Sequence, residues 1–316
     1  MESRKIIKFG KNSYVLTLPH EWMQKNKLNK GDLLFLREMQ NGIFISSSSE
    51  YKQDENKSII NTDNKTKFEI QREIVVAYVN DSKVIELVGK DVLSQSSDIV
   101  RFIKNFMSLE VIEQLPEKIV IRDFLNFKDI SLTTTTKRID NIIRLMIEDC
   151  KRILEGDEKE SILQSSQIIS RFYFLTYRIV RSGLSDASVR NSLGMSSISL
   201  LEHWEIKEIF RRICGECKSI YYYAHELGPR KKKEREDIQN FLKTMDIYYR
   251  DIMKAYYTND KLLSHRVRND CKNFVEELNS YIDKNRSSTI PFLVTHIKYF
   301  TTTVMDLSRH ILNNIY

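Results

Sequence analysis

Apolar residues recur with a period of two near the N-terminus of this chain and with a helical period over most of the remainder. The period of two over residues 13–18 predicts a half-buried strand. Pro19 ends that strand and can start a short helix, because a proline at the first helical position loses no hydrogen bond. A second strand is predicted at residues 33–36, and Asn41-Gly42 predicts a hairpin turn into residues 43–45.

This N-terminal unit, residues 1–48, is too short to bury the apolar surface that a stable domain needs, so we expect it to dimerise. Residues 1–45 contain eight Lys and Arg against four Asp and Glu, so +4 of the formal net charge of +7 lies here. A polyanion partner is therefore best sought at this unit. The candidate DNA-binding residues lie near its start: Arg4, Lys5, Lys8, Lys11, Asn12 and Ser13. From these cations alone, a solvated strand edge, which lysines commonly protect, is the favoured interpretation.

The N-terminal unit resembles the AbrB/SpoVT family of swapped-hairpin DNA-binding domains. The matching residues follow the family's order over nearly the whole unit: Arg4-Lys5, Gly10, Ser13, Leu18-Pro19, Trp22, Leu28, Gly31-Asp32 and Gly42-Ile43. The resemblance implies that two chains interleave their hairpins into one β-barrel and present a basic surface to DNA.

Two further segments follow before the long helices begin. Residues 49–67 are polar and contain few apolar positions, which predicts a flexible linker. Residues 68–130 mix the two periods and predict a small α/β connector whose apolar residues form a core. Its expected elements are helices at 68–79 and 98–107 and strands at 83–88, 109–115 and 118–122.

From residue 131 to residue 316 the pattern is helical apart from an irregular segment around Gly194, and one of the long helices is expected at about 261–284. Residues 141–157 align with residues 244–260 at a constant offset of 103 residues, and both segments are amphipathic and end in a polar turn that closes with Asp. Two copies of three antiparallel helices, at about 131–228 and 236–316, are the simplest architecture. The expected fold class is therefore α+β and multidomain, with a β-barrel half, an α/β connector and a duplicated three-helix bundle.

The helical region resembles PhoU, the phosphate-uptake regulator. A Gly156-Asp157 turn follows its first helix, and Ser170 to Leu175 matches the Asp-Arg-hydrophobic-Tyr-Phe-Leu segment of archaeal members. An AbrB-like unit followed by PhoU repeats is a recurring archaeal arrangement. The resemblance implies a role in phosphate homeostasis, with the bundle as a sensor or a site for a protein partner.

The positions at which PhoU repeats commonly carry metal-binding carboxylates differ in this chain. Such carboxylates lie four residues apart on a helix, so that both face one metal cluster. The corresponding positions here hold hydroxyls, cations and a glycine: Ser166, Ser170, Arg211, Gly215, Lys298 and Thr302. We therefore expect the bundle to bind no metal, and no other cofactor is expected.

Two further motifs have competing interpretations. Cys214 and Cys217 form a C-x-x-C, but no strand precedes them and no second ligand pair completes a zinc site, so helix packing is favoured over redox or metal chemistry. The basic run at 230–235 is interpreted as a solvated helix start, with a second contact to the DNA backbone as the alternative. No phosphate-binding loop, nucleophile elbow or zincin motif is present, so we do not expect an enzyme.

No stretch of eighteen apolar residues occurs, so no membrane insertion is expected, and four cysteines in so long a chain favour a reducing cytoplasm. The favoured function is a cytoplasmic, dimeric, DNA-binding transcriptional regulator with a PhoU-like bundle that senses a signal or binds a protein partner. The alternative is a protein–protein adaptor of phosphate transport in which the N-terminal barrel only dimerises.

Overall fold

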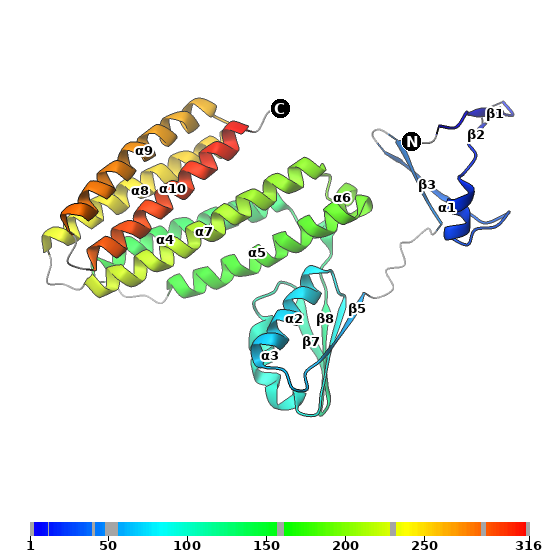
Figure 1. Ribbon diagram of the computed structural model, residues 1–316, viewed down its shortest axis with the longest axis horizontal. Coiled ribbons are helices and arrows are strands. Elements are labelled where there is room, and N and C mark those ends of the chain that lie inside the picture. The colour runs from blue at the N-terminus through cyan, green and yellow to red at the C-terminus, as the bar shows by residue number, and fades with distance from the viewer. Residues whose placement is uncertain are drawn as a thin grey trace. The chain divides into compact units, whose positions relative to one another are not determined.

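The computed structural model describes residues 3–11, 13–39, 42–47, 56–156, 161–227, 232–285 and 289–313. The chain divides into two compact units, Met1–Glu55 and Asn56–Tyr316. The first unit consists of short strands and one short helix, and the second contains a four-stranded sheet followed by long helices (Figure 1). This layout confirms the α+β class expected from the sequence.

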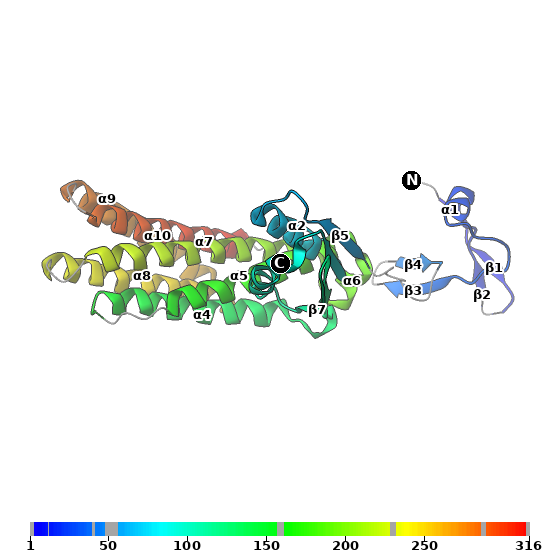
Figure 2. The same cartoon turned by 90° about the horizontal axis from the view of Figure 1, so that it is seen from below.

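The first unit contains two antiparallel hairpins (Figure 2). Its elements are β1 (Ile7–Phe9), β2 (Ser13–Val15), α1 (His20–Lys25), β3 (Phe35–Met39) and β4 (Gly42–Ser46). The strand predicted over 13–18 is shorter, and the one predicted over 33–36 begins later and runs further. The hairpin predicted between the strands at 33–36 and 43–45 is present, but Gly42 pairs with Met39 as the first residue of β4 instead of lying in the turn.

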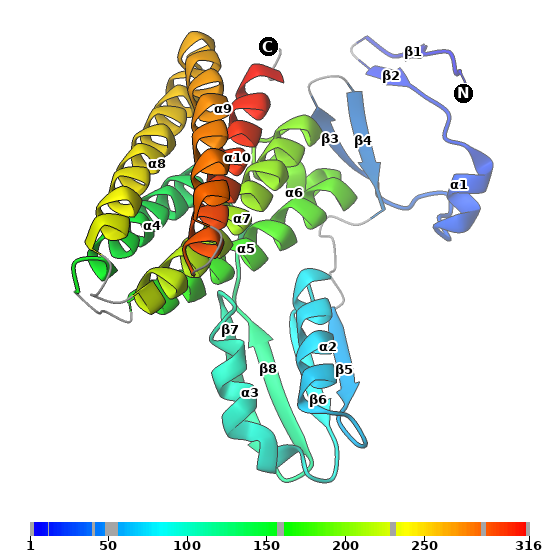
Figure 3. The same cartoon turned by 60° about the vertical axis from the view of Figure 1, so that its left-hand side comes forward.

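The sheet of the second unit has the strand order β5-β6-β8-β7 (Figure 3). Strands β5 and β6 are parallel, whereas β6 with β8 and β7 with β8 are antiparallel. The elements are β5 (Lys57–Asn61), α2 (Lys67–Val79), β6 (Val84–Val88), α3 (Ser96–Ile103), β7 (Leu109–Leu115) and β8 (Lys118–Asp123). The two helices and three strands predicted for the connector are thus present, although α3 begins and ends earlier than expected.

The linker prediction is wrong for residues 57–61, because they form β5. This strand lies at the edge of the sheet, where only one neighbour pairs with it. Ile60 is buried and Ile59 is 64% exposed, so the strand needs few apolar residues. Helix α2 then begins with a capping box, in which Glu69 N donates to Thr66 Oγ1 and Thr66 N donates to the Glu69 carboxylate. Residues 49–55 lie outside the described residues.

The remaining chain forms the helices α4 (Leu132–Ile153), α5 (Ser161–Ser185), α6 (Ala187–Ser192), α7 (Ser197–Leu227), α8 (Lys232–Thr258), α9 (Lys261–Lys284) and α10 (Ile290–Asn313). Helices α4, α5 and α7 contact one another, and so do α8, α9 and α10. Contacts of α7 with α10 and of α4 with α8 join the two groups around one apolar core. The short α6 occupies the segment for which the sequence predicted no regular structure.

Helix α5 joins the bundle to the sheet, which has its own apolar core. Phe174 and Tyr177 of α5 pack against that core, and the ring of Phe174 lies 5.0 Å from the ring of Phe106. One turn further, Arg178 has no exposed side-chain surface and donates hydrogen bonds to Asp81 and Asp123 of the sheet part. The sheet part and the bundle are therefore joined by an apolar contact and a buried ionic one.

Candidate nucleic-acid interface

The first hairpin carries most of the candidate DNA-binding residues. Strand β1 pairs with β2 so that Lys8 lies opposite Tyr14 and Phe9 lies opposite Ser13. Opposite residues of an antiparallel pair share a face, so Lys8 projects from the same face as the Tyr14 ring. Gly10 has a φ of +73°, a left-handed conformation that glycine adopts without steric cost, and this lets the chain reverse between the two strands.

The cations of this hairpin are accessible. Arg4, Lys5, Lys8, Lys11 and Ser13 are all exposed, and Asn12 lies outside the described residues. Arg4 Nη1 donates to Thr17 Oγ1 at 3.0 Å, which fixes the chain that leads into β1. Within the described part of the chain, Lys5, Lys8 and Lys11 form no ion pair or hydrogen bond, so these ammonium groups are free to meet phosphate oxygens.

The described apolar residues of the first unit do not form a core of their own. Among the described side chains of residues 3–47 none is buried, and Trp22 of α1 is only half-buried. Several large apolar side chains are at least two-thirds exposed: Ile6, Phe9, Tyr14, Leu33, Leu36 and Ile43. A single chain therefore leaves these side chains in water, at a cost of roughly 25 cal/mol for each Å² of apolar surface. A second chain that covers them would remove that cost.

The C-x-x-C pair lies within α7 and both thiols are buried. Burial raises the pKa of the Cys214 thiol. The hydrogen bond with Cys150, together with burial, raises the pKa of Cys217, and Cys150 Sγ donates to the Cys217 carbonyl at 3.2 Å. A redox thiol needs the opposite shift, since the thiolate is the reactive form. These cysteines are therefore placed for helix packing.

The positions compared with metal ligands make local contacts instead. Ser170 Oγ donates to the Ser166 carbonyl, Arg211 pairs with Glu208, and Thr302 Oγ1 donates to the Tyr299 carbonyl. Within the described ranges no group of three His, Cys, Asp or Glu residues is placed to hold a metal ion. The metal-free bundle stays a prediction.

The structure bears on two further expectations from the sequence, the basic run and the absence of a membrane span. Of the basic run at 230–235, residues from Lys232 onward begin α8, whereas residues 230 and 231 lie outside the described part. None of the described helices is both long and apolar enough to cross a membrane.

Residues 7–57 match a family model described as antidote-toxin recognition MazE, bacterial antitoxin. A comparison with curated proteins and one with solved structures found no match. The match covers most of the first unit and supports an AbrB-like domain there, with a DNA-binding or antitoxin-type regulatory role. It ends at Lys57, the first residue of the sheet in the second unit, and does not reach helices α2 to α10.

Proposed function

We propose that the protein is a dimeric DNA-binding regulator, with the first unit as its DNA-binding and dimerisation domain. The observation that carries the proposal is the first hairpin, on which free lysines lie in a unit whose described residues include no buried side chain. Dimerisation would bury the apolar residues and double the number of cations. A doubled basic surface suits DNA, which carries one negative charge per 1.7 Å or so of helix axis.

The test is binding of the full-length protein to duplexes selected from a random-sequence pool. We expect Lys8→Ala/Lys11→Ala to weaken binding at least about tenfold, since it removes four cations from a dimer. The matched control is Lys25→Ala/Lys30→Ala, which removes the same charge from exposed positions of the same unit. Equal affinity of the wild type and the Lys8/Lys11 variant would contradict the proposal.

The helical region is proposed to be a PhoU-like module that senses a signal or binds a protein partner. Two groups of three mutually packed helices, together with the repeat offset of 103 residues, support this. The resemblance to PhoU implies phosphate homeostasis as the physiological context. Genomic footprinting at high and low phosphate tests this context, and occupancy that does not change with phosphate would contradict it.

The second candidate function is a protein–protein adaptor whose first unit only dimerises. The exposed apolar residues favour it, because dimerisation alone would account for them. Light scattering separates the two candidates when combined with the binding assay. If the Lys8/Lys11 variant stays dimeric and loses DNA, the regulator is supported. A dimer that binds no duplex from the pool would support the adaptor.

A further inference from the structure

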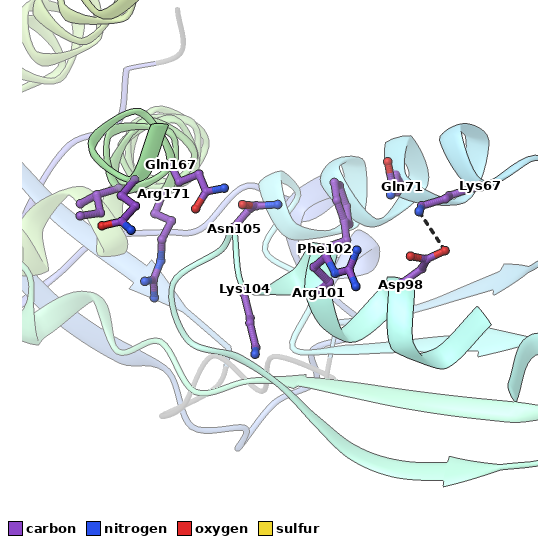
Figure 4. A pocket seen from close by; sticks show the side chains of 11 residues that line it. Lys67, Gln71, Asp98, Arg101, Phe102, Lys104, Asn105, Gln167 and Arg171 are labelled. Carbon is purple, nitrogen blue, oxygen red and sulfur yellow. Dashed lines mark ion pairs between the residues drawn. The ribbon is translucent and has the colours of Figure 1, made fainter. Parts of the chain in front are cut away.

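A cavity of about 510 Å³ lies in the second unit, between the sheet part and the bundle. Helices α2 and α3 line one side of it and α5 lines the other. Figure 4 shows Gln167 of α5 and Asn105, which follows α3, pointing toward one another from these two sides. Its volume is in the range of roughly 300–1,000 Å³ that is usual for small-molecule sites.

The charge of this cavity is strongly unbalanced. Four cations line it: Lys67, Arg101, Lys104 and Arg171. Its one lining carboxylate belongs to Asp98 and pairs with Lys67 at 2.8 Å. The hydrogen bond from Lys67, with the charges of Lys67 and Arg101, outweighs burial and lowers the pKa of Asp98, so this carboxylate stays ionised near neutral pH.

The other three cations are Arg101, Lys104 and Arg171, and the charge of Arg101 helps to lower the pKa of Asp98. Among the described residues Arg101, Lys104 and Arg171 form no ion pair and no hydrogen bond, and all three are exposed. In Figure 4 the side chains of Lys104 and Arg171 extend in the same direction from the two sides of the cavity. Like charges around one cavity repel one another, so an anion between them would relieve that repulsion.

The remaining wall suits a molecule larger than a simple ion. Four amide side chains line it, and each offers both hydrogen-bond donors and an acceptor: Gln71, Asn105, Gln164 and Gln167. Phe102 adds an apolar surface and is held in place by an edge-on contact with Phe106, whose ring centre lies 5.4 Å away. A bare inorganic anion would leave the amides and the Phe102 ring without a ligand contact.

We propose that this cavity binds a phosphorylated small molecule of nucleotide size, whose phosphate oxygens meet Arg101, Lys104 and Arg171. Arginine guanidinium groups match the geometry of phosphate oxygens, because their N–H donors form a planar fork. The amides and Phe102 then contact the uncharged part of the ligand.

The position of the cavity gives its occupant a structural consequence. Arg171 precedes Arg178 by seven residues, which is close to two helical turns, so both lie on the face of α5 that meets the sheet part. Phe174 lies between them on the same face and packs on the core of the sheet part. A bound ligand would extend this junction and hold the two parts together. Regulation of DNA binding by such a ligand rests on the proposed function, but binding of the ligand to the cavity does not.

The experiment is isothermal titration calorimetry on the full-length protein, without divalent metal, using ATP, AMP, inorganic phosphate and citrate. We expect ATP or AMP to bind, and inorganic phosphate to bind at least about tenfold more weakly. Citrate should bind more weakly than ATP. Arg101→Gln/Arg171→Gln should weaken nucleotide binding at least about tenfold, because each arginine supplies charge-assisted hydrogen bonds. The matched control is Arg181→Gln, an exposed arginine on α5 that does not line the cavity.

Three results would overturn the inference: no nucleotide binding at millimolar concentration, binding that the double variant retains, or citrate binding as tight as that of ATP. Inorganic phosphate binding as tightly as AMP would identify the free anion as the ligand and overturn the nucleotide size. The double variant should keep wild-type affinity for DNA without ligand. If neither the wild type nor the double variant binds DNA, the proposed function is contradicted but the inference about this cavity is not.

Discussion

Replacing Arg178 with methionine is expected to destabilise the second unit, because Arg178 is one of two cations in a buried ionic cluster. Its side chain and that of Asp123 have no exposed surface, and those of Asp81 and Lys83 are 14% and 22% exposed. Lys83 Nζ lies 3.0 Å from Asp123 Oδ2 and 3.3 Å from Asp81 Oδ1. The cluster is neutral with Arg178 and carries one net negative charge without it.

The size of the effect depends on which hydrogen-bond and ion-pair partners Asp123 retains in the variant. Removing one partner of a buried ion pair costs about 3–5 kcal/mol, because the remaining charge is left without compensation. In Arg178→Met, Asp123 still accepts from Lys83, from Ser108 Oγ at 2.6 Å and from the Leu125 amide at 3.1 Å. Since Asp123 keeps these contacts, we expect a loss of about 3 kcal/mol, at the lower end of that range.

The contribution of the same cluster to stability should depend on pH. Burial opposes ionisation of Asp123, but hydrogen bonding and charge from Arg178, with Ser108 and Lys83, outweigh it and lower the pKa of Asp123. A lowered carboxyl pKa contributes stability at neutral pH that is lost as pH falls through the folded pKa. Between pH 7 and pH 3 the wild type should therefore lose more stability than Arg178→Met.

Urea unfolding followed by circular dichroism measures this loss. The double variant Arg178→Met/Asp81→Asn removes one charge of each sign, so it should recover at least about 1 kcal/mol relative to Arg178→Met. The matched control is Arg309→Met, whose exposed pair with Asp306 should contribute less than about 1 kcal/mol. An Arg178→Met protein within 1 kcal/mol or so of the wild type, or a double variant no more stable than the single one, would refute the reasoning.

Three other predictions concern the bundle and the segment before it. Lys207 has a side chain only 2% exposed, its Nζ lies 3.2 Å from the ring centre of Trp204, and burial lowers its pKa to about 8. Between about pH 8 and pH 10 the unfolded chain binds more protons than the folded one, so the free energy of unfolding of the wild type should rise by up to about 3 kcal/mol relative to that of Lys207→Met. Urea unfolding measures this, and free energies that change with pH in the same way in both proteins would contradict it. The purified protein should contain no stoichiometric transition metal, and its melting temperature should not respond to a chelator; one tightly held ion per chain in elemental analysis would contradict this. Ten Gly and Ser residues inserted at 49–55 should leave DNA affinity unchanged, because the polar composition of this segment predicts a tether, which mostly sets reach and local concentration. A large change in affinity would indicate mechanical coupling.

Long elements with a clear period were predictable from the sequence. The helix from Lys261 to Lys284 was predicted at its observed bounds, since Asp260 caps its start and its apolar stripe is regular. Strand β5 was not predictable in the same way, because an edge strand with one buried apolar residue has almost the composition of a linker. Helix α6 was missed because six residues are too few to show a period.

The candidate sites also differ in how far the sequence alone could predict them. The candidate DNA-binding residues lie within ten positions of one another, so the sequence alone grouped them, but it did not predict that β1 and β2 pair as a hairpin. The ionic cluster unites residues 81, 123 and 178, and the cavity unites residues 67, 101 and 171. Nothing local marks these residues, and both sites are completed only when α5 packs against the sheet part. Their prediction needed the tertiary structure.

The salt dependence of DNA binding tests the central claim most directly. The measurement is the slope of log K against log salt for the full-length wild type, Lys8→Ala/Lys11→Ala and Lys25→Ala/Lys30→Ala. If Lys8 and Lys11 of both chains contact phosphates, the first variant should reduce the magnitude of the slope by about 3.6, which is 0.9 or so for each of four contacts. The Lys25/Lys30 variant should keep the wild-type slope. A slope that the Lys8/Lys11 substitutions leave unchanged, or that both variants reduce equally, would contradict the assignment of DNA binding to the first hairpin.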